Sequence, residues 1–252
     1  MHSQQVQIGC IQESQTRQQE ATNKLEHGTF FGLCAPDTTD PSQQQHGLGF
    51  YVANQWTTAV TQIHRPHNRI CYIQIDMNDS ANNAQRRPKY LIVINAYAPH
   101  SGRDATERRE FYTQLQTEYQ NLLRTAALIF IGGDFNAKIG LRSSPDETFL
   151  GKHGKGTRNA SGHMMVDFLQ ENQLYATNTT FRNRMTNRST FAGYFSQPLD
   201  PLLPLEQRQI KWYFNTIDYV LFHGRTFSDI QASFNARDHM QAIPSWAQTI
   251  NL

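Results

Sequence analysis

The stretch Ile131-Gly-Gly-Asp-Phe-Asn-Ala-Lys-Ile-Gly140 decides the fold of this sequence. The apolar run Ala127-Leu-Ile-Phe-Ile131 predicts a buried strand, and the two glycines after it allow the backbone to turn sharply. Alternation in Asp134-Phe-Asn136 directs both polar side chains to one side and Phe135 toward the core. The sequence therefore predicts a carboxylate and a carboxamide presented together at a strand end, although these residues would also fit a simple turn.

Other apolar segments on both sides of this stretch predict strands that carry polar residues at or near an end. A polar group at the end of a buried strand faces a loop, where binding and catalytic side chains are commonly found. Any one of them would also fit a capped strand end or a surface charge, so their order along the chain is the useful observation. These segments are Val6–Gln12 followed by Glu13, Lys89–Tyr97 followed by Pro99, and Thr216–Phe222 containing Asp218.

Helical periodicity and turn residues predict the remaining elements. Thr106–Arg124 and Gly162–Asn172 carry apolar residues at helical spacing, and Ser161 or Asn159 would cap the second helix. Strands near both ends of the sequence with helices between them favour one α/β (α+β) layered domain over residues 1–252. We also expect a helix at Gln18–Leu25, strands at Gly47–Ala53, Thr57–Ile63 and Arg69–Asp76, and an insertion loop at Ser196–Gln209.

Composition narrows the class of protein. The chain has 252 residues, 38% of them apolar, with a mean hydropathy of -0.62. We find neither a run of about 18 apolar residues, as a membrane helix requires, nor the start of a signal peptide. Cys10, Cys34 and Cys71 are odd in number and widely spaced, so we expect reduced thiols. The sequence predicts an intracellular protein, nuclear or cytoplasmic, with no membrane partner.

Positive charge is concentrated downstream of the Gly-Asp-Phe-Asn stretch. Residues 137–190 contain eight Lys/Arg and four Asp/Glu, a local charge of +4, whereas the whole chain has a formal charge of +2. A local basic excess favours contact with a nucleic-acid backbone. The Gly-rich part, Lys152–Gly162, would either cradle phosphates through backbone N–H groups or form a flexible surface loop.

Taken in order, these motifs resemble the endonuclease/exonuclease/phosphatase superfamily. They are most similar to the endonuclease domain of non-LTR retrotransposon polyproteins, the LINE type, and of host proteins derived from them. The resemblance extends over Val6–His239. The motifs that carry it are Asn95-Ala-Tyr-Ala-Pro99, Gly133-Asp-Phe-Asn-Ala-Lys-Ile-Gly140, Gly154-Lys-Gly-Thr-Arg-Asn-Ala-Ser-Gly162 and Ile217-Asp-Tyr-Val-Leu221.

The resemblance implies a four-layered α/β sandwich of two packed mixed sheets flanked by helices. It also implies a Mg²⁺ cofactor, with Mn²⁺ as a second candidate, and DNA as the partner, in some cases beside a reverse transcriptase domain in a longer polyprotein. The implied metal residues are Glu13 and Asp238. Five catalytic residues are implied. Tyr97 and Asn136 would contact the scissile phosphate or the attacking water, and Asp134 would orient or deprotonate that water. His239, paired with Asp218, would neutralise charge or act as general base. The implied DNA-binding residues are Lys152, Lys155, Arg158 and Asn159.

Two departures from the family pattern qualify these expectations. The family begins with an Asn-bearing strand some tens of residues before the Gln-Glu pair, but the twelve residues before Glu13 contain no Asn. We therefore expect the first core strand to be missing. Near the other end, Arg237-Asp238-His239 stands where Ser-Asp-His is expected, so His239 would be either the catalytic histidine or a loop residue. We expect residues 240–252 to form an irregular tail.

Three functions remain open at this point. The first is a DNA endonuclease that nicks one strand and leaves a 3′ hydroxyl, as in retrotransposon integration. The second is a degenerate, catalytically silent relic or host binding protein of the same fold. The third is a phosphodiesterase or phosphatase that acts on RNA, a nucleotide or a phosphoinositide.

Overall fold

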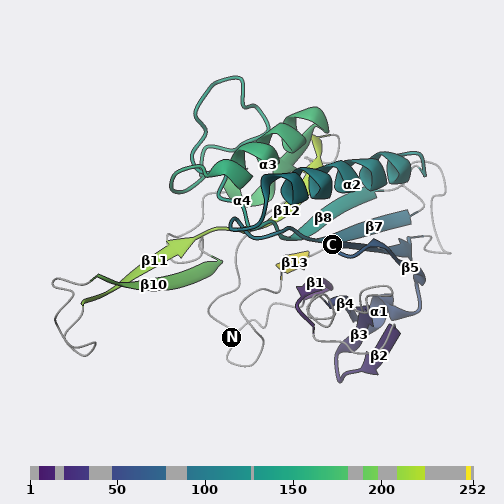
Figure 1. Ribbon diagram of the computed structural model, residues 1–252. Coiled ribbons are helices and arrows are strands. Elements are labelled where there is room, and N and C mark those ends of the chain that lie inside the picture. Colours follow the sequence, from purple (N-terminus) through teal and green to yellow (C-terminus); the bar gives the residue numbers. More distant parts are fainter. Residues whose placement is uncertain are drawn as a thin grey trace.

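Two β-sheets face each other, and the longer helices cover the outer face of one of them, as the computed structural model in Figure 1 shows. Apolar side chains from both sheets fill the space between them. The structure describes residues 6–14, 20–33, 47–77, 90–125, 128–180, 190–197, 209–224 and 248–250.

The six-stranded sheet contains the two apolar strands predicted before Pro99 and before the Gly-Asp-Phe-Asn stretch. β7 and β8 lie at its centre and run parallel, whereas every other pair in this sheet is antiparallel. Dense runs of Ile, Val and Leu suit this position because a central strand between two packed layers is buried on both faces. In spatial order its strands are β5 (Val60–His67), β6 (Ile70–Asp76), β7 (Tyr90–Tyr97), β8 (Leu128–Asp134), β12 (Asp218–His223) and β9 (Leu174–Ala176).

The five-stranded sheet joins distant parts of the sequence. Its described pairings are all antiparallel, and β1 lies between β13 and β4. Ile8, Leu48, Phe50 and Val52 of this sheet are completely buried against the other sheet. In spatial order its strands are β13 (Gln248–Ile250), β1 (Ile8–Gln12), β4 (Leu48–Ala53), β3 (Gly28–Leu33) and β2 (Glu20–Lys24).

Strand β7 shows how the two hydrophobic layers are built. Ile92 and Ile94 pack in the layer between the six-stranded sheet and the helices, while Leu91 and Val93 pack in the layer between the two sheets. All four side chains are fully buried. Successive side chains of a strand point to opposite faces, so one continuous apolar run supplies both layers.

The two longer helices lie on one face of the six-stranded sheet, and the two short helices lie beside individual strands. α2 (Ala105–Leu123) and α3 (Ala160–Glu171) cover the outer face of the six-stranded sheet (Figure 1), into which α2 directs Phe111, Leu115 and Tyr119. The four-residue α1 (Asn54–Thr57) lies beside β3 and β4, and α4 (Thr177–Thr180) beside β12. None of the helices in the described ranges is long and apolar enough to cross a membrane.

A separate hairpin projects from this body. β10 (Phe191–Gln197) pairs antiparallel with β11 (Gln209–Asn215), and the two strands extend away from both sheets in Figure 1. The insertion predicted at Ser196–Gln209 begins and ends inside these strands, and its middle part, residues 198–208, lies outside the described residues. The hairpin strands themselves were not predicted.

The predicted fold class is confirmed, since two packed sheets are flanked by helices. Among the described pairings, strand directions are mixed in the six-stranded sheet, whereas those of the five-stranded sheet are all antiparallel. The helix predicted at Gln18–Leu25 is wrong for the part described, because residues 20–24 pair with β3, and Thr and Asn are weak helix formers. Within the tail expected to be irregular, residues 248–250 form β13. The expectation of a missing first strand stays a prediction.

Asn95 joins the two sheets by buried hydrogen bonds. Its side chain has no exposed surface. Its Nδ2 donates to the carbonyl oxygens of Ile11, at 2.9 Å, and Gly49, at 2.8 Å. Its Oδ1 accepts from Nε2 of Gln12 at 2.5 Å. Because buried polar groups are costly when unpaired, these bonds fix how β7 sits against β1 and β4.

Asn95→Ala should lower the free energy of unfolding by about 2–3 kcal/mol, because it leaves buried polar groups without hydrogen-bond partners. These groups are the carbonyls of Ile11 and Gly49 and the side-chain amide of Gln12. Chemical denaturation followed by circular dichroism measures this change. Asn54→Ala is the matched control, because Asn54 bonds the carbonyl of Glu26 at an exposed position and should lose less than about 1 kcal/mol. Equal losses in both variants would contradict the assignment.

Candidate active site

Three polar side chains form a row across neighbouring strands of the six-stranded sheet. Tyr97 is the last residue of β7, Asp134 is the last of β8, and Asp218 is the first of β12. In the strand register Asp134 lies opposite both Tyr97 and Asp218. The parallel pair and the antiparallel pair thus bring all three to one edge of the sheet.

The turn after β8 adds Asn136 to this row. Gly133 has φ +154°, and a Cβ there would lie 1.9 Å from the carbonyl oxygen of Ala96, so only glycine fits. Asn136 has φ +46°; its backbone N–H donates to Oδ1 of Asp134 at 2.8 Å, and its Nδ2 donates to the carbonyl of Ala98 at 2.9 Å. Phe135 between them is buried. The carboxylate and carboxamide are therefore presented together, as the sequence predicted.

Glu13 reaches the same edge from the other sheet. It directly follows β1, has φ +54°, and accepts a 2.5 Å hydrogen bond from the Tyr97 hydroxyl. Burial and this bond to Glu13 raise the pKa of Tyr97. Tyr97 therefore keeps its proton and acts as a hydrogen-bond donor near neutral pH. Arg69, whose guanidinium lies 5.6 Å from the Tyr97 ring centre, was not predicted as part of the site.

Asp218 is held by residues that the sequence did not single out. Oγ1 of Thr190 accepts the backbone N–H groups of Ile217, at 3.0 Å, and Asp218, at 3.2 Å. Nδ2 of Asn178 donates to the carbonyl of Asp218 at 3.3 Å, while its Oδ1 accepts the N–H of Val220 at 3.2 Å. Thr190 and Asn178 are ordinary polar residues in the sequence, and only the tertiary structure assigns them this role.

The carboxyl groups of the row disfavour each other's ionisation. Burial, together with the charge of Glu13, raises the pKa of Asp134 to about 7, although the hydrogen bond from the Asn136 N–H acts in the opposite direction. Burial and the charge of Asp134 hold the pKa of Asp218 well above its ordinary value. Oδ1 of Asp218 is buried without a hydrogen-bond partner among the described residues. The site therefore concentrates negative charge that a cation would stabilise.

The chemistry of these donors fits a hard divalent cation. Glu13, Asp134 and Asp218 supply carboxylate oxygens, which Mg²⁺ prefers, and the unpaired oxygen of Asp218 is the kind of group that a cation or its water satisfies. Among the described residues, no group of three or more His, Cys, Asp or Glu side chains is arranged so that it could hold a metal ion. Mg²⁺ usually binds through one or two carboxylates, several waters and the substrate's phosphate.

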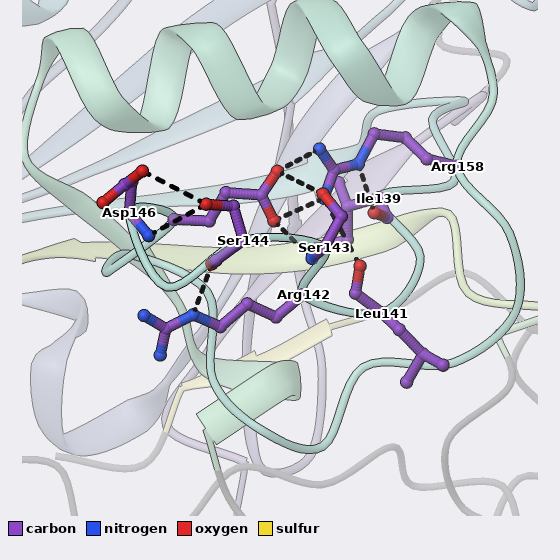
Figure 2. Close-up of polar contacts among 8 residues, drawn as sticks. Ile139, Leu141, Arg142, Ser143, Ser144, Asp146 and Arg158 are labelled. Atoms are coloured by element: carbon purple, nitrogen blue, oxygen red, sulfur yellow. Dashed lines mark hydrogen bonds and ion pairs between the residues drawn. The ribbon is translucent and has the colours of Figure 1, made fainter.

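The predicted DNA-binding residues are divided between the surface and the interior of one loop. Lys152 is exposed and Lys155 is partly exposed. Arg158 instead forms an ion pair with Glu147 and donates from Nε to the carbonyl of Ile139 at 2.8 Å (Figure 2). Asn159 caps α3 by accepting the N–H of Gly162 at 2.8 Å. The cap is confirmed, while contact of these residues with DNA stays a prediction.

Two predicted site residues cannot be placed. Asp238 and His239 lie outside the described residues, so the pairing of His239 with Asp218 stays a prediction. Of the three cysteines, Cys10 and Cys71 are buried free thiols, and Cys34 lies outside the described residues.

Sequence comparison identifies one family and two curated relatives. Residues 1–236 match the family described as Endonuclease/Exonuclease/phosphatase. Craniofacial development protein 2 of Bos taurus is 29% identical over 149 residues, 59% of this chain and 22% of that protein. The protein of the same name from Tragulus javanicus is 31% identical over 122 residues, 47% of this chain and 21% of that protein. The matches thus cover about a fifth of these relatives' length.

Structure comparison supports the fold. The endonuclease domain of TRAS1, a telomere-specific non-LTR retrotransposon, has a TM-score of 0.51 and 14% identity, covering 88% of this chain and 80% of the other. The catalytic domain of Xenopus laevis APE2 has a TM-score of 0.50 and 15% identity, covering 87% of this chain and 74% of the other. At such low identity the likeness concerns the fold alone.

Asp218→Asn should stabilise the protein at pH 8 in buffer with a chelator. The folded-state pKa of Asp218 is raised, so its contribution to stability is present below the unfolded-state pKa of about 3.9 and is lost as the pH rises toward the folded value. Asparagine removes this loss. Denaturant unfolding at pH 4 and pH 8 measures it, with exposed Asp167→Asn as the control. A variant less stable than wild type at pH 8 would refute the prediction.

Proposed function

Because the chain belongs to the endonuclease/exonuclease/phosphatase family, we propose that it is a Mg²⁺-dependent phosphodiesterase that nicks one strand of DNA and leaves a 3′ hydroxyl. The observation that carries the proposal is the row of Tyr97, Asp134 and Asp218 at one sheet edge, joined by Glu13 and Asn136. Phosphodiester hydrolysis needs a held water, a proton acceptor and charge stabilisation at the phosphate. Each of these tasks has a candidate residue in the row.

Proton transfer is assigned to Asp134. With its pKa raised to about 7, this carboxyl can accept a proton from water near neutral pH more effectively than an ordinary aspartate. The Asn136 N–H bound to its Oδ1 fixes one oxygen and leaves the other for the water. His239, paired with Asp218, is the second candidate base in the same proposal.

Phosphate binding is assigned to Tyr97 and Asn136, and metal binding to Glu13. The Tyr97 hydroxyl is a donor at the pH of the reaction, and the bond to Ala98 fixes the orientation of the Asn136 carboxamide. Glu13, together with Asp238, would hold Mg²⁺. When bound, Mg²⁺ neutralises charge on the phosphate oxygens in the transition state.

A nucleic acid is favoured as the substrate by charge. Lys152 and Lys155 lie in the basic stretch downstream of β8, where residues 137–190 have a local charge of +4. TRAS1, which shares the fold, is named as a retrotransposon endonuclease, and this supports the choice of DNA and of a reverse transcriptase partner. RNA, nucleotides and phosphoinositides are the alternative substrates, and a silent relic is the alternative to an enzyme.

Purified protein should nick supercoiled plasmid in Mg²⁺ and stop when EDTA is added. Glu13→Ala, Asp134→Ala and Asn136→Ala should each slow nicking at least about 100-fold, because each removes a group that contacts reacting atoms. Glu110→Ala, an exposed acidic residue on α2, is the control and should keep full activity. Nicking that these three changes leave intact would reject the site.

Parallel assays on RNA, a nucleotide diester and a phosphoinositide complete this test. Faster turnover of one of these than of DNA would replace the proposed substrate while keeping the site. If none of these substrates is turned over in the presence of Mg²⁺ or Mn²⁺, the silent relic is favoured.

Lys152→Ala should weaken DNA binding by the same factor on every sequence, since a phosphate contact carries no sequence information. The slope of log affinity against log salt should fall by about one. Fluorescence anisotropy at several salt concentrations measures both quantities. Glu171→Ala, an exposed position on α3, is the control, and an unchanged slope for Lys152→Ala would contradict the contact.

A further inference from the structure

The segment Ala137–Ile139, which directly follows Asn136, is held by hydrogen bonds from two sides. On one side, the buried Tyr219 hydroxyl accepts the N–H of Ile139 at 3.4 Å and shares its proton between the carbonyls of Thr216, at 2.8 Å, and Ala137, at 3.1 Å. On the other side, Asn159 Oδ1 accepts the N–H of Lys138 at 3.0 Å, and the Asn159 N–H donates to the carbonyl of Lys138 at 3.1 Å.

Arg158 holds the last backbone group of this segment, the carbonyl of Ile139, through Nε at 2.8 Å. Its two terminal nitrogens bind the two carboxylate oxygens of Glu147, with Nη2 at 2.9 Å from Oε2. Only 11% of the Arg158 side chain and 9% of the Glu147 side chain are exposed. Figure 2 shows the guanidinium pointing into the loop, toward Ile139 and Ser143.

The carboxylate of Glu147 is also held by a second residue, Ser143. The N–H and the hydroxyl of Ser143 each donate to its carboxylate at 2.8 Å. The bonds from Arg158, and then those from Ser143, lower the pKa of Glu147 to about 2. The pair thus remains ionised across the pH range in which a phosphodiesterase works.

This support matters because Asn136 has an unfavourable backbone conformation. Its φ of +46° lies in the left-handed region, which is less favourable than the right-handed region for residues other than glycine, although asparagine adopts it more readily than most. Close packing limits the segment further, since a Cβ at Gly162 would lie 1.9 Å from the carbonyl oxygen of Lys138. Any loosening of Ala137–Ile139 would therefore be transmitted directly to Asn136.

We infer that Arg158 and Glu147 are positioning residues for Asn136, and that Arg158 is not a ligand of the DNA backbone. Contact with a phosphate would require the guanidinium to leave a bidentate carboxylate partner and a backbone carbonyl. Such forked bonds are specific in geometry, and lysine does not reproduce them. The inference rests on the proposed function for its effect on turnover, and on the contacts alone for its effect on the loop.

Glu147→Gln separates the two roles of Arg158 because they predict opposite results. If Arg158 positions Asn136, kcat for plasmid nicking should fall about 10- to 100-fold, since a small displacement near the reacting atoms has such an effect. KM and the salt slope of DNA binding should stay within about twofold of wild type. If Arg158 binds phosphate, removing its carboxylate partner should leave kcat unchanged and tighten binding, which would overturn the inference.

Arg158→Lys distinguishes the two roles in a second way, because lysine keeps the positive charge but cannot form the bidentate hydrogen bonds to Glu147. Positioning predicts that kcat falls as in Glu147→Gln, whereas a phosphate contact predicts near-normal activity. Glu118→Gln is the matched control, since Glu118 pairs with His67 at 3.3 Å on the far part of α2 and should leave kcat unchanged.

Amide hydrogen exchange tests the positioning without any need for activity. In both Glu147→Gln and Arg158→Lys the amides of Lys138 and Ile139 should exchange at least about tenfold faster than in wild type, while those of β7 stay protected. Unchanged exchange at these two amides would overturn the inference. If wild type hydrolyses no phosphodiester, the proposed function fails, and the exchange result still decides whether the pair holds the segment.

Discussion

The parallel pairing of β7 with β8 is the constraint on which the site depends. Because both strands run in the same direction, their carboxyl ends reach one edge of the sheet and bring Tyr97 beside Asp134. The connection between parallel strands must cross the sheet, and α2 makes this crossing while covering the apolar face. A shift of one residue in this register would turn Ile92 and Ile94 away from their layer, so the core that stabilises the fold also fixes the geometry of the site.

Stability and chemistry oppose each other at this edge. Asp134 and Asp218 lie in adjacent strands, where burial and mutual repulsion raise the pKa values of both carboxyl groups. A fold selected for stability alone would place apolar or neutral residues there. The surrounding hydrogen bonds, from Asn95 between the sheets to Thr190 beside Asp218, hold this unfavourable arrangement in one geometry. Such a concentration of strain and charge is typical of functional sites.

The sequence predicted the elements whose signal is local. β7, β8 and α2 follow from apolar runs and helical spacing, and Tyr97 and Asp134 stand out as polar residues at their ends. The strand at residues 20–24 could not be predicted from local signals. It is stabilised by pairing with β3, and its side chains do not alternate clearly between buried and exposed. The roles of Thr190 and Glu147 depend on partners far along the chain or on loop geometry, which no periodicity records. Charge suggested a DNA contact for Arg158, whereas the structure reveals its carboxylate partner.

The pairing of β1 with β13 has a consequence for the order of folding. Ile8 lies opposite Ile250, so two segments from opposite parts of the sequence must meet to complete the five-stranded sheet. Contacts between such distant residues form slowly, because the intervening chain loses entropy before the contact stabilises it. During synthesis the edge of β1 that pairs with β13 stays open until residues 248–250 have been made. The other pairings of this sheet lie within residues 8–53, and the six-stranded sheet is built from residues 60–223, so both can assemble before β13 joins β1.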